Sequence, residues 1–461
     1  MKTTIKYFAF VAAALFAAGP VLAQDTASGN GKTDTVTVRD SSAKTTKSVT
    51  ASLVRPLEIQ YYRAPDQRGL NVFETPKENT VPFEGFKLSL GAAFTQQFQA
   101  LEHENSATAR LVNNVDQNKL MEIGDGFNNA TANLYLNAQL APGIRVALTS
   151  YLSSRHHNET WVKDGYILID ESPFKVTALE NLMKYVTLRI GHFEVNYGDA
   201  HFRRSDNGNA IHNPFVGNLI MDAFTTEIGG EVYVRAKGFL AMGGVTAGES
   251  RGQVVRPNDR AWAFVGKLGF DRQANDNLRV RLTGSTFQQQ KSISNTLYAG
   301  DRAGARYYYV MENTLATESA QFRSGLINPG LSSKVKAYML NPFVKYRGLE
   351  LFGVIEQAQG RAANETANRT WDQYAAEAIY RFFPGERLFV GARYNTAQGE
   401  LTGITNDVAL DRTQFGGGWF ITNNLLMKAE YVTQKYRDFP TADIRSGGKF
   451  NGWMVEAVVA F

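Results

Sequence analysis

The sequence predicts an all-β protein whose strands close into a transmembrane antiparallel β-barrel of about 16 strands. Three observations support this fold class. The chain begins with a segment that has the features of a cleaved secretory signal. Apolar and polar residues alternate in many segments from Phe86 onward, and the connections between these segments are short and long in turn.

Residues 1–23 have the three parts of a signal peptide. Two Lys residues make the beginning basic, residues 7–18 are apolar, and Val-Leu-Ala forms a small-residue cleavage site at the end. The apolar stretch is shorter than the roughly 20 residues that a spanning helix needs. We therefore expect a cleaved signal and an exported mature chain.

The composition excludes several classes of function. The chain has no Cys, which excludes a disulfide scaffold, a lipidated N-terminus and thiolate chemistry. Its formal net charge of +5 is a small surplus and not the concentrated basic patch that nucleic-acid binding needs. The 20 Tyr and 29 Phe fit strands with one apolar face. We expect no nucleic-acid partner and no cofactor.

Two segments precede the first strand. Residues 24–55 are rich in Ser, Thr, Asp, Lys and Gly, and they lack the bulky apolar groups whose burial would offset the entropy lost on ordering. We expect them to form a disordered polar segment. Residues 56–85 contain more aromatic residues and Pro, and they are predicted to form an ordered lead-in. The barrel itself is predicted to span residues 86–461.

Period-two alternation predicts the individual strands. In the first one, Phe86, Leu88 and Leu90 alternate with polar or small residues, as expected when one face contacts outer-membrane lipid. The number of such segments is even, as in single-chain bacterial barrels. They start near residues 86, 129, 143, 161, 185, 226, 238, 260, 278, 335, 349, 372, 387, 412, 425 and 451.

The connections between these segments indicate how the strands are arranged. Short turns lie near residues 141, 237, 271, 347, 384 and 422. Long segments are 102–128, 198–225, 288–333, 359–370, 398–411 and 436–449. Two connections depart from this alternation: residues 171–184 are longer than the short turn expected there, and residues 154–160 are shorter than the long loop expected there. Short turns at one rim and long loops at the other are typical of outer-membrane barrels.

Charged side chains recur on the face of the predicted strands opposite to the apolar row. A packed soluble core could not solvate so many charges, whereas a water-filled lumen could. The alternation places nine basic and seven acidic residues in the lumen, which is nearly balanced. They are Arg145, Arg189, Arg235, Arg279, Arg281, Lys336, Arg381, Arg393 and Lys428, with Glu227, Glu231, Glu350, Glu356, Glu377, Glu430 and Glu456.

The last segment alternates from Trp453 to a C-terminal Phe461, and it resembles the terminal strand of bacterial outer-membrane barrels. The long loop after the fifth strand and the lead-in RPLEIQYYRAPDQRGLNVFE are similar to those of the general porins of Bacteroidota and, more distantly, of the phosphate-selective porins O and P. The resemblance covers residues 86–461 by architecture. It implies an outer-membrane barrel of sixteen strands, usually a homotrimer, whose third extracellular loop, here 198–225, narrows the pore.

The segment RIGHFEVNYGDAHFRRSDNGNAIHNPFVGNLIMDAF, residues 189–224, is rich in groups that could carry chemistry. His192, His201 and His212 lack the close spacing of zinc-ligand pairs. Ser205 with Asp199 and His201 or His212 has the residue types of a hydrolase without its strand or helix context. We therefore predict no metal and no catalytic residues. The predicted pore constriction consists of Asp199, His201, Arg203, Arg204 and Asp206.

These observations predict a non-enzymatic porin for passive diffusion of small hydrophilic solutes, with a mild anion preference from Arg203 and Arg204. The relatives that select phosphate use a ladder of Arg and Lys, which this loop lacks. One alternative is surface binding or secretion through the loop that contains Tyr307-Tyr308-Tyr309, and another is an outer-membrane hydrolase. DTVTV at residues 34–38 resembles an energy-coupling box, but the chain is too short for a plug domain and twenty-two strands.

Overall fold

The computed structural model describes residues 59, 62–74, 77, 81–153, 160–250, 254–300, 306–317 and 324–461. The predicted signal peptide, the polar segment 24–55 and the motif at 34–38 lie outside the described residues. Within the described part of the chain, no helix is both long and apolar enough to cross a membrane.

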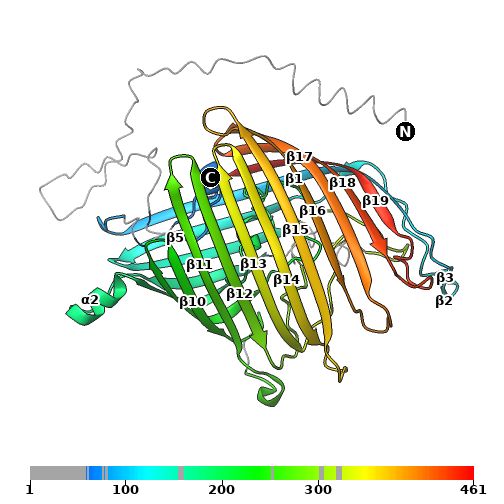
Figure 1. Cartoon of the computed structure of the whole chain (residues 1–461), viewed down its shortest axis with the longest axis horizontal. Helices are drawn as coiled ribbons and strands as arrows, with labels where there is room; N and C mark the ends of the chain where they lie inside the picture. Colours follow the sequence, from blue (N-terminus) through cyan, green and yellow to red (C-terminus); the bar gives the residue numbers. More distant parts are fainter. Residues whose placement is uncertain are drawn as a thin grey trace, which may run out of the picture. The chain divides into compact units, whose positions relative to one another are not determined.

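Sixteen antiparallel strands of the described chain form one closed sheet, the barrel of Figure 1. Each strand pairs with its neighbours along the chain, and β1 pairs with β19 to close the barrel. The strands are β1 (Lys87–Glu104), β5 (Thr131–Ala141), β6 (Ile144–Ser153), β7 (Thr160–Ile169), β8 (Val186–Glu194), β9 (Thr226–Ala236), β10 (Phe239–Thr246), β11 (Ala263–Asn275), β12 (Leu278–Gln289), β13 (Lys334–Tyr346), β14 (Leu349–Arg361), β15 (Arg369–Phe382), β16 (Leu388–Gly399), β17 (Val408–Thr422), β18 (Leu425–Arg437) and β19 (Lys449–Ala460).

The predicted fold class is confirmed, and every predicted strand is present. Each strand begins within four residues of its predicted start. The agreement has a simple cause: side chains on a strand alternate between two faces, so a lipid-facing row leaves a regular apolar pattern in the sequence. The strands β5 to β10 have 8 to 11 residues, whereas β11 to β18 have 12 to 15.

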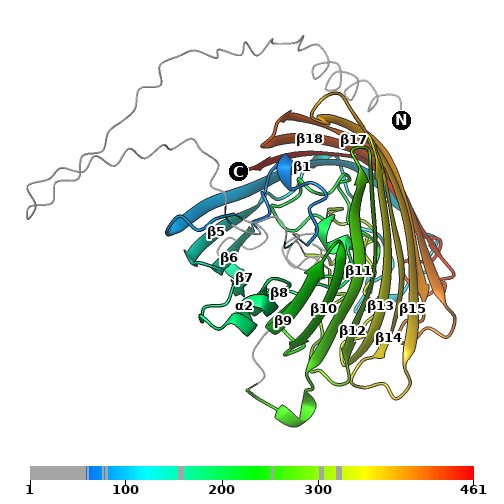
Figure 2. The same cartoon turned by 60° about the vertical axis from the view of Figure 1, so that its left-hand side comes forward.

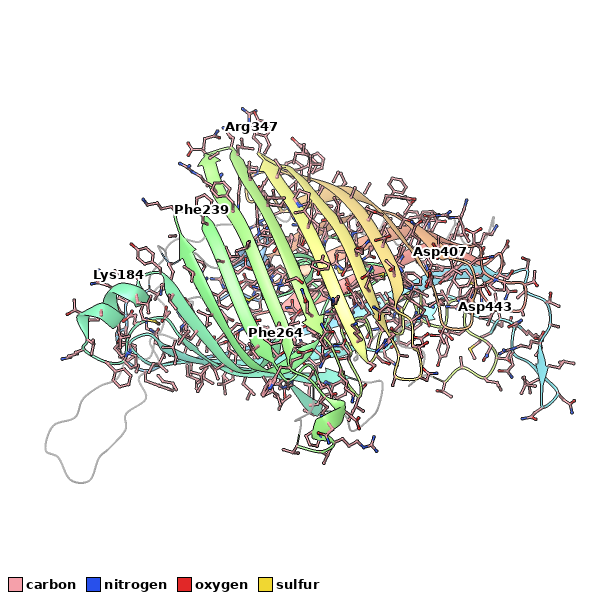
Figure 3. The ribbon with its side chains drawn as sticks, turned by 60° about the horizontal axis from the view of Figure 1, so that its bottom comes forward. Lys184, Phe239, Phe264, Arg347, Asp407 and Asp443 are labelled. Atoms are coloured by element: carbon pink, nitrogen blue, oxygen red, sulfur yellow. The ribbon has the colours of Figure 1, made fainter. Side chains whose placement is uncertain are left out.

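Short turns and long loops lie at opposite rims. The turn between β9 and β10 consists of Lys237 and Gly238, both with positive φ, as a two-residue hairpin turn requires. At the same rim, the longer connection from β7 to β8 contains the helix α2 (Thr177–Met183). Figure 3 shows Phe239 at the rim of the short turns and Phe264 at the opposite end of the barrel wall.

Smaller elements lie in the connections. In the first loop, β2 (Leu111–Val112) and β3 (Val115–Asp116) form a separate hairpin, and β4 (Gly126–Phe127) adds two residues beside β1. The 3₁₀ helices are η1 (Gln67–Gly69), η2 (Ala200–Phe202) and η3 (Pro257–Asp259).

The two faces of the wall differ as the alternation predicts. Outward side chains such as Leu90 and Leu268 are apolar and exposed, at 71% and 67%. Of the predicted lumen residues, Arg145, Arg281, Arg393, Glu227, Glu231 and Glu377 are buried, and Arg189 and Arg279 are partly buried. A closed barrel with an apolar outer surface is the structure of proteins that span the bacterial outer membrane, and the chain lies in that membrane.

The placement of Lys336 in the lumen is wrong. Its neighbours Val335 and Ala337 are the buried residues of this part of β13, and Tyr338, which shares the face of Lys336, is half exposed. The prediction assumed that a charged residue on a strand points into the lumen. At this end of β13, however, the inward side chains are apolar.

An apolar core inside the barrel explains that reversal. Wall residues such as Val335 and Trp371 pack in one cluster with Val216, Ile220 and Tyr307 from two long loops. Figure 2 shows coil segments inside the ring of strands. Loops that fold inward therefore cover much of the wall, and more of the chain lies in the lumen than the one narrowing loop that the sequence predicts.

Ile355→Arg on the outer face of β14 is expected to lower the free energy of unfolding by about 2–4 kcal/mol, because it places a charge in the lipid core. Ile355 is 49% exposed and lies in the middle of its strand. Phe239→Arg, at the rim, is the control and should cost about 0–1 kcal/mol. Guanidinium denaturation in phospholipid vesicles measures both. Equal losses at the two positions would contradict the assigned depths.

Candidate functional site

The connection between β8 and β9, residues 195–225, folds into the barrel, and we call it the inward loop. At Gly208 the loop lies close to the backbone of the wall: a Cβ there would lie 2.5 Å from Cα of Ala132 and 2.8 Å from the carbonyl oxygen of Ala93. The hydroxyl of Thr95 donates to the carbonyl oxygen of Gly208 at 2.7 Å. The loop therefore touches the backbone of β1 and β5, where a larger residue would not fit.

Asp199 attaches the beginning of the inward loop to β11 and β12. Its carboxylate lies 2.7 Å from Nζ of Lys267, and it accepts hydrogen bonds from Nε of Arg281 at 2.8 Å and from the hydroxyl of Thr283 at 2.7 Å. Asp199 is 0% exposed. A carboxylate is stable at such a depth only when charges and hydrogen bonds compensate it. Asp199 therefore holds the loop in place and does not face open space.

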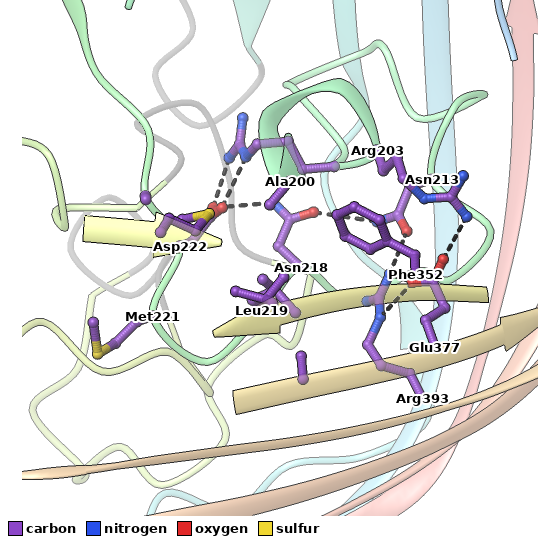
Figure 4. A pocket seen from close by; sticks show the side chains of 15 residues that line it. Ala200, Arg203, Asn213, Asn218, Leu219, Met221, Asp222, Phe352, Glu377 and Arg393 are labelled. Atoms are coloured by element: carbon purple, nitrogen blue, oxygen red, sulfur yellow. Dashed lines mark hydrogen bonds and ion pairs between the residues drawn. The ribbon is translucent and has the colours of Figure 1, made fainter. Parts of the chain in front are cut away.

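Arg203 binds two carboxylates of the wall. Its Nη2 lies 2.5 Å from the carboxylate of Glu377 and 3.5 Å from that of Glu350. Arg393 of β16 binds the same Glu377 at 2.7 Å, so Glu377 bridges the loop and the wall (Figure 4). The positive charge of Arg203 is compensated by these contacts.

Arg204 is compensated in the same way. Its Nη2 and Nε donate to the carboxylate of Asp222 at 2.6 and 2.8 Å, and its Nη1 lies 3.4 Å from Asp206. Asp206 also accepts from the hydroxyl of Tyr151 and from Nζ of Lys163, the latter at 2.5 Å. These bonds fix the tip of the inward loop against β6 and β7.

Lys163 is surrounded by three carboxylates. They belong to Asp206 at 2.5 Å, Glu194 at 2.9 Å and Asp164 at 3.5 Å. Nδ1 of His201 lies 3.5 Å from the carboxylate of Glu194. Carboxylates therefore outnumber ammonium groups at this point of the lumen.

The apolar end of the inward loop is bound through its backbone. Four of its N–H groups, including that of Gly217, donate to side chains of the wall, which satisfies polar groups that are buried away from water. The other three bonds join Val216 to Glu430 (2.7 Å), Ile220 to Asn395 (2.6 Å) and Met221 to Gln373 (2.8 Å). Wall and loop thus form one packed unit here.

Residues 62–74, which we call the lumenal segment, belong to the predicted lead-in and lie at the short-turn end of the barrel. The backbone N–H of Gln67 donates to the carbonyl oxygen of Asn423 at 2.9 Å, and its side chain donates to that of Gly385 at 2.7 Å. Asn423 and Gly385 belong to two of the short turns. The sequence predicted an ordered lead-in but not its position.

Further along, the lumenal segment contacts the charged groups that hold the inward loop. Glu74 binds Lys267 at 2.8 Å and Arg281 at 2.5 Å, the same two cations that bind Asp199. Phe73 packs edge-on against Phe202 of the inward loop, with ring centroids 5.6 Å apart. The only feature of the sequence that could have indicated this position is the charged residues that lie between the aromatic residues of the lumenal segment.

The long loop between β12 and β13 also reaches into the barrel. The hydroxyl of Tyr307 donates to Glu430 of β18 at 2.7 Å, and the backbone N–H of Tyr308 donates to Gln99 of β1 at 2.9 Å. Tyr307 and Tyr308 are 1% and 7% exposed. The expectation that this tyrosine run forms a binding surface is wrong for both residues, because both are buried and the ring of Tyr307 joins the apolar core inside the barrel.

A cavity of about 310 Å³ lies between the lumenal segment, the inward loop and the inner face of β5 to β9. Its lining includes Tyr62 and Arg63 of the lumenal segment, His201, Arg204 and Asp206 of the inward loop, and Tyr135, Lys163 and Arg189 of the wall. A second cavity, of about 20 Å³, lies beside Arg203, Asn218 and Glu377 (Figure 4) and has room for about one water molecule.

The geometry of a hydrolase is not formed by the residues that suggested one. The hydroxyl of Ser205 accepts from the amide of Asn213 at 3.1 Å, and Nε2 of His201 lies 2.9 Å from Oδ1 of Asn196. The carboxylate of Asp199 binds wall cations instead of a His. Among the described residues, no group of three or more His, Cys, Asp or Glu could hold a metal ion.

No protein family and no curated protein matches the sequence. Solved structures do match. An anion-selective porin from Comamonas acidovorans has 13% identity and a TM-score of 0.51, and the match covers 82% of this chain and 100% of that one. The outer membrane channel DcaP of Acinetobacter baumannii has 9% identity and a TM-score of 0.48, with 82% and 98% covered. OmpT, an outer membrane protein of Vibrio cholerae, has 11% identity and a TM-score of 0.48, and the match covers 82% of this chain and 100% of that one.

At these identities the likeness shows the fold alone, and this conclusion rests on the Comamonas acidovorans structure. The chain has a porin-type outer-membrane barrel.

Asp199→Asn is expected to lower the free energy of unfolding by about 3 kcal/mol, because it removes the charge that compensates two buried cations. Guanidinium denaturation of the refolded barrel measures the loss. Asp443→Asn is the matched control: the ion pair of Asp443 with Arg445 is partly exposed, so its loss should cost less than about 1 kcal/mol. A similar small effect for Asp199→Asn would show that Asp199 does not anchor the loop.

Proposed function

We propose that the chain is a porin for passive diffusion of small hydrophilic solutes across the outer membrane. The observation that carries the proposal is the polar cavity of about 310 Å³ inside the closed barrel. This volume is at the lower end of the roughly 300–1,000 Å³ of cavities that hold small organic molecules. Charged and aromatic side chains line it, as expected for a path taken by hydrated solutes.

The inward loop is the proposed constriction, and its five predicted residues have different parts in it. His201, Arg204 and Asp206 line the cavity and are placed to meet a solute. Arg203 and Asp199 face wall residues and hold the loop in position. Both loop arginines are paired with carboxylates, so the proposed mild anion preference has to come from another group.

Three further features belong to this proposal. The chain functions as a homotrimer, it has no enzymatic activity, and it belongs with the general porins of Bacteroidota. The first and third follow from the resemblance of the lead-in and the long loop. The second is supported by the different hydrogen-bond partners of Ser205 and His201, which are Asn213 and Asn196.

A second candidate function is surface binding or secretion by a barrel that does not conduct. It is favoured by the apolar core, which fills the lumen on the side of the long strands β11 to β18. A coupled transporter with twenty-two strands is a different architecture from the sixteen-stranded barrel seen in the described residues.

Refolded protein lacking the signal is expected to give stable current steps in planar bilayers without any energy source. Homotrimers would insert as groups of three equal steps. The measurement is single-channel conductance of barrels whose folding is verified by the electrophoretic shift between heated and unheated samples. Folded barrels that never conduct would overturn the porin proposal in favour of the second candidate.

Arg203→Ala/Arg204→Ala is expected to shift selectivity toward cations, because the substitutions remove the cation that binds Asp222 and one of the two cations that bind Glu377. Reversal potentials in a potassium chloride gradient measure the shift. Arg437→Ala/Arg445→Ala is the control, and its reversal potential should match that of the wild type. Arg437 at the end of β18 and Arg445 in the following loop form partly exposed ion pairs, and neither lines the cavity. If both double variants keep the wild-type value, the inward loop does not line the narrowest point.

A further inference from the structure

Arg63 carries a positive charge that its contacts do not neutralise. Its Nε donates to the carbonyl oxygen of Gly69 at 3.0 Å, and its Nη2 donates to that of Phe202 at 2.9 Å. Carbonyl oxygens accept hydrogen bonds but bring no negative charge. Among the described residues, no carboxylate lies within ion-pair distance of Arg63. This distinguishes it from Arg203 and Arg204.

Arg63 stays charged at neutral pH and borders the open cavity. Burial lowers its pKa to about 9, because removal from water disfavours the charged form, and this value still leaves the group protonated at pH 7. The two carbonyl groups hold the guanidinium in one orientation at the edge of the cavity of about 310 Å³. The cavity therefore has one fixed cationic site on the lumenal segment.

The same cavity has a site of opposite charge on its wall. Lys163 is shared by the carboxylates of Asp164, Glu194 and Asp206, at 3.5, 2.9 and 2.5 Å. Arg204 reaches Asp206 only at 3.4 Å and is already paired with Asp222. One ammonium group cannot compensate three carboxylates, so negative charge remains here.

The cationic site at Arg63 and the carboxylates around Lys163 are connected through two neighbouring residues of the inward loop. Phe202, whose carbonyl oxygen holds Arg63, directly follows His201, and His201 lies 3.5 Å from the carboxylate of Glu194. Arg63 and Glu194 also interact electrostatically. A cation and a surplus of carboxylates thus border one small cavity.

We propose that this cavity selects small zwitterions of the amino-acid class. The carboxylate of the solute binds Arg63, and its ammonium group binds Glu194 and Asp164. Inside walls of low dielectric, a solute that carries both charges can compensate both sites, whereas an ion or a neutral solute leaves at least one uncompensated. The inference rests on the proposed function, because the solute must first enter the barrel.

The test compares the permeation of a zwitterion and of a neutral solute of similar size. Liposomes that contain the refolded protein are placed at pH 7 in isosmotic L-serine or erythritol, and the initial swelling rates are measured. The wild type should admit L-serine about threefold faster than erythritol, the gain that one weakly screened ion pair provides. Arg63→Gln should reduce this ratio to about one, and Arg63→Lys, which keeps the charge, should retain most of it.

Arg68→Gln is the matched control. Arg68 lies in the same segment but is paired with Asp66 at 2.8 Å and is half exposed, so its removal should leave the ratio unchanged. The electrophoretic shift on heating verifies that every variant is folded.

The outcomes separate this inference from the proposed function. If erythritol enters but L-serine has no advantage, or if Arg63→Gln keeps the advantage, the zwitterion site is overturned and the porin proposal stands. If neither solute enters liposomes that contain folded wild-type barrels, both proposals fall.

Discussion

The interior of this barrel depends on the need to compensate every buried charge within the barrel itself. Lys267 and Arg281 project from the wall into a space where water is scarce, and an unpaired charge there would be very costly. Asp199 of the inward loop and Glu74 of the lumenal segment both bind these two cations. One cluster of four charges therefore joins the wall to two of the segments that lie in the lumen.

This pairing also explains why the cavity lies to one side. Charges and apolar side chains attach the inward loop to the long strands β11 to β18, where the apolar core forms. On the side of the shorter strands, the loop is held at its beginning, where Asn196 meets Glu231, and at its tip, where Asp206 meets Lys163 and Tyr151. The space that remains is therefore bounded by β5 to β9 and has a charged lining.

The outer wall could be predicted from the sequence, but the contents of the lumen could not. Leu90 and its neighbours on β1 reveal the wall because contact with lipid imposes a local pattern. The partner of Arg203 is Glu377, which is 174 residues away, and no local pattern encodes that pairing. Lys336 and Tyr307 were misplaced for a related reason: apolar loops inside the barrel reverse the rule that inward side chains are polar.

The pairing of β1 with β19 has a consequence for assembly. It aligns Ala93 with Ala460, so the first and last strands of the barrel meet only after the C-terminal end of the chain has been synthesised. Until then both strands have a free edge, and such edges invite pairing with other chains. Contacts between residues so distant in sequence form slowly. The newly exported chain therefore needs protection from aggregation until this last seam closes.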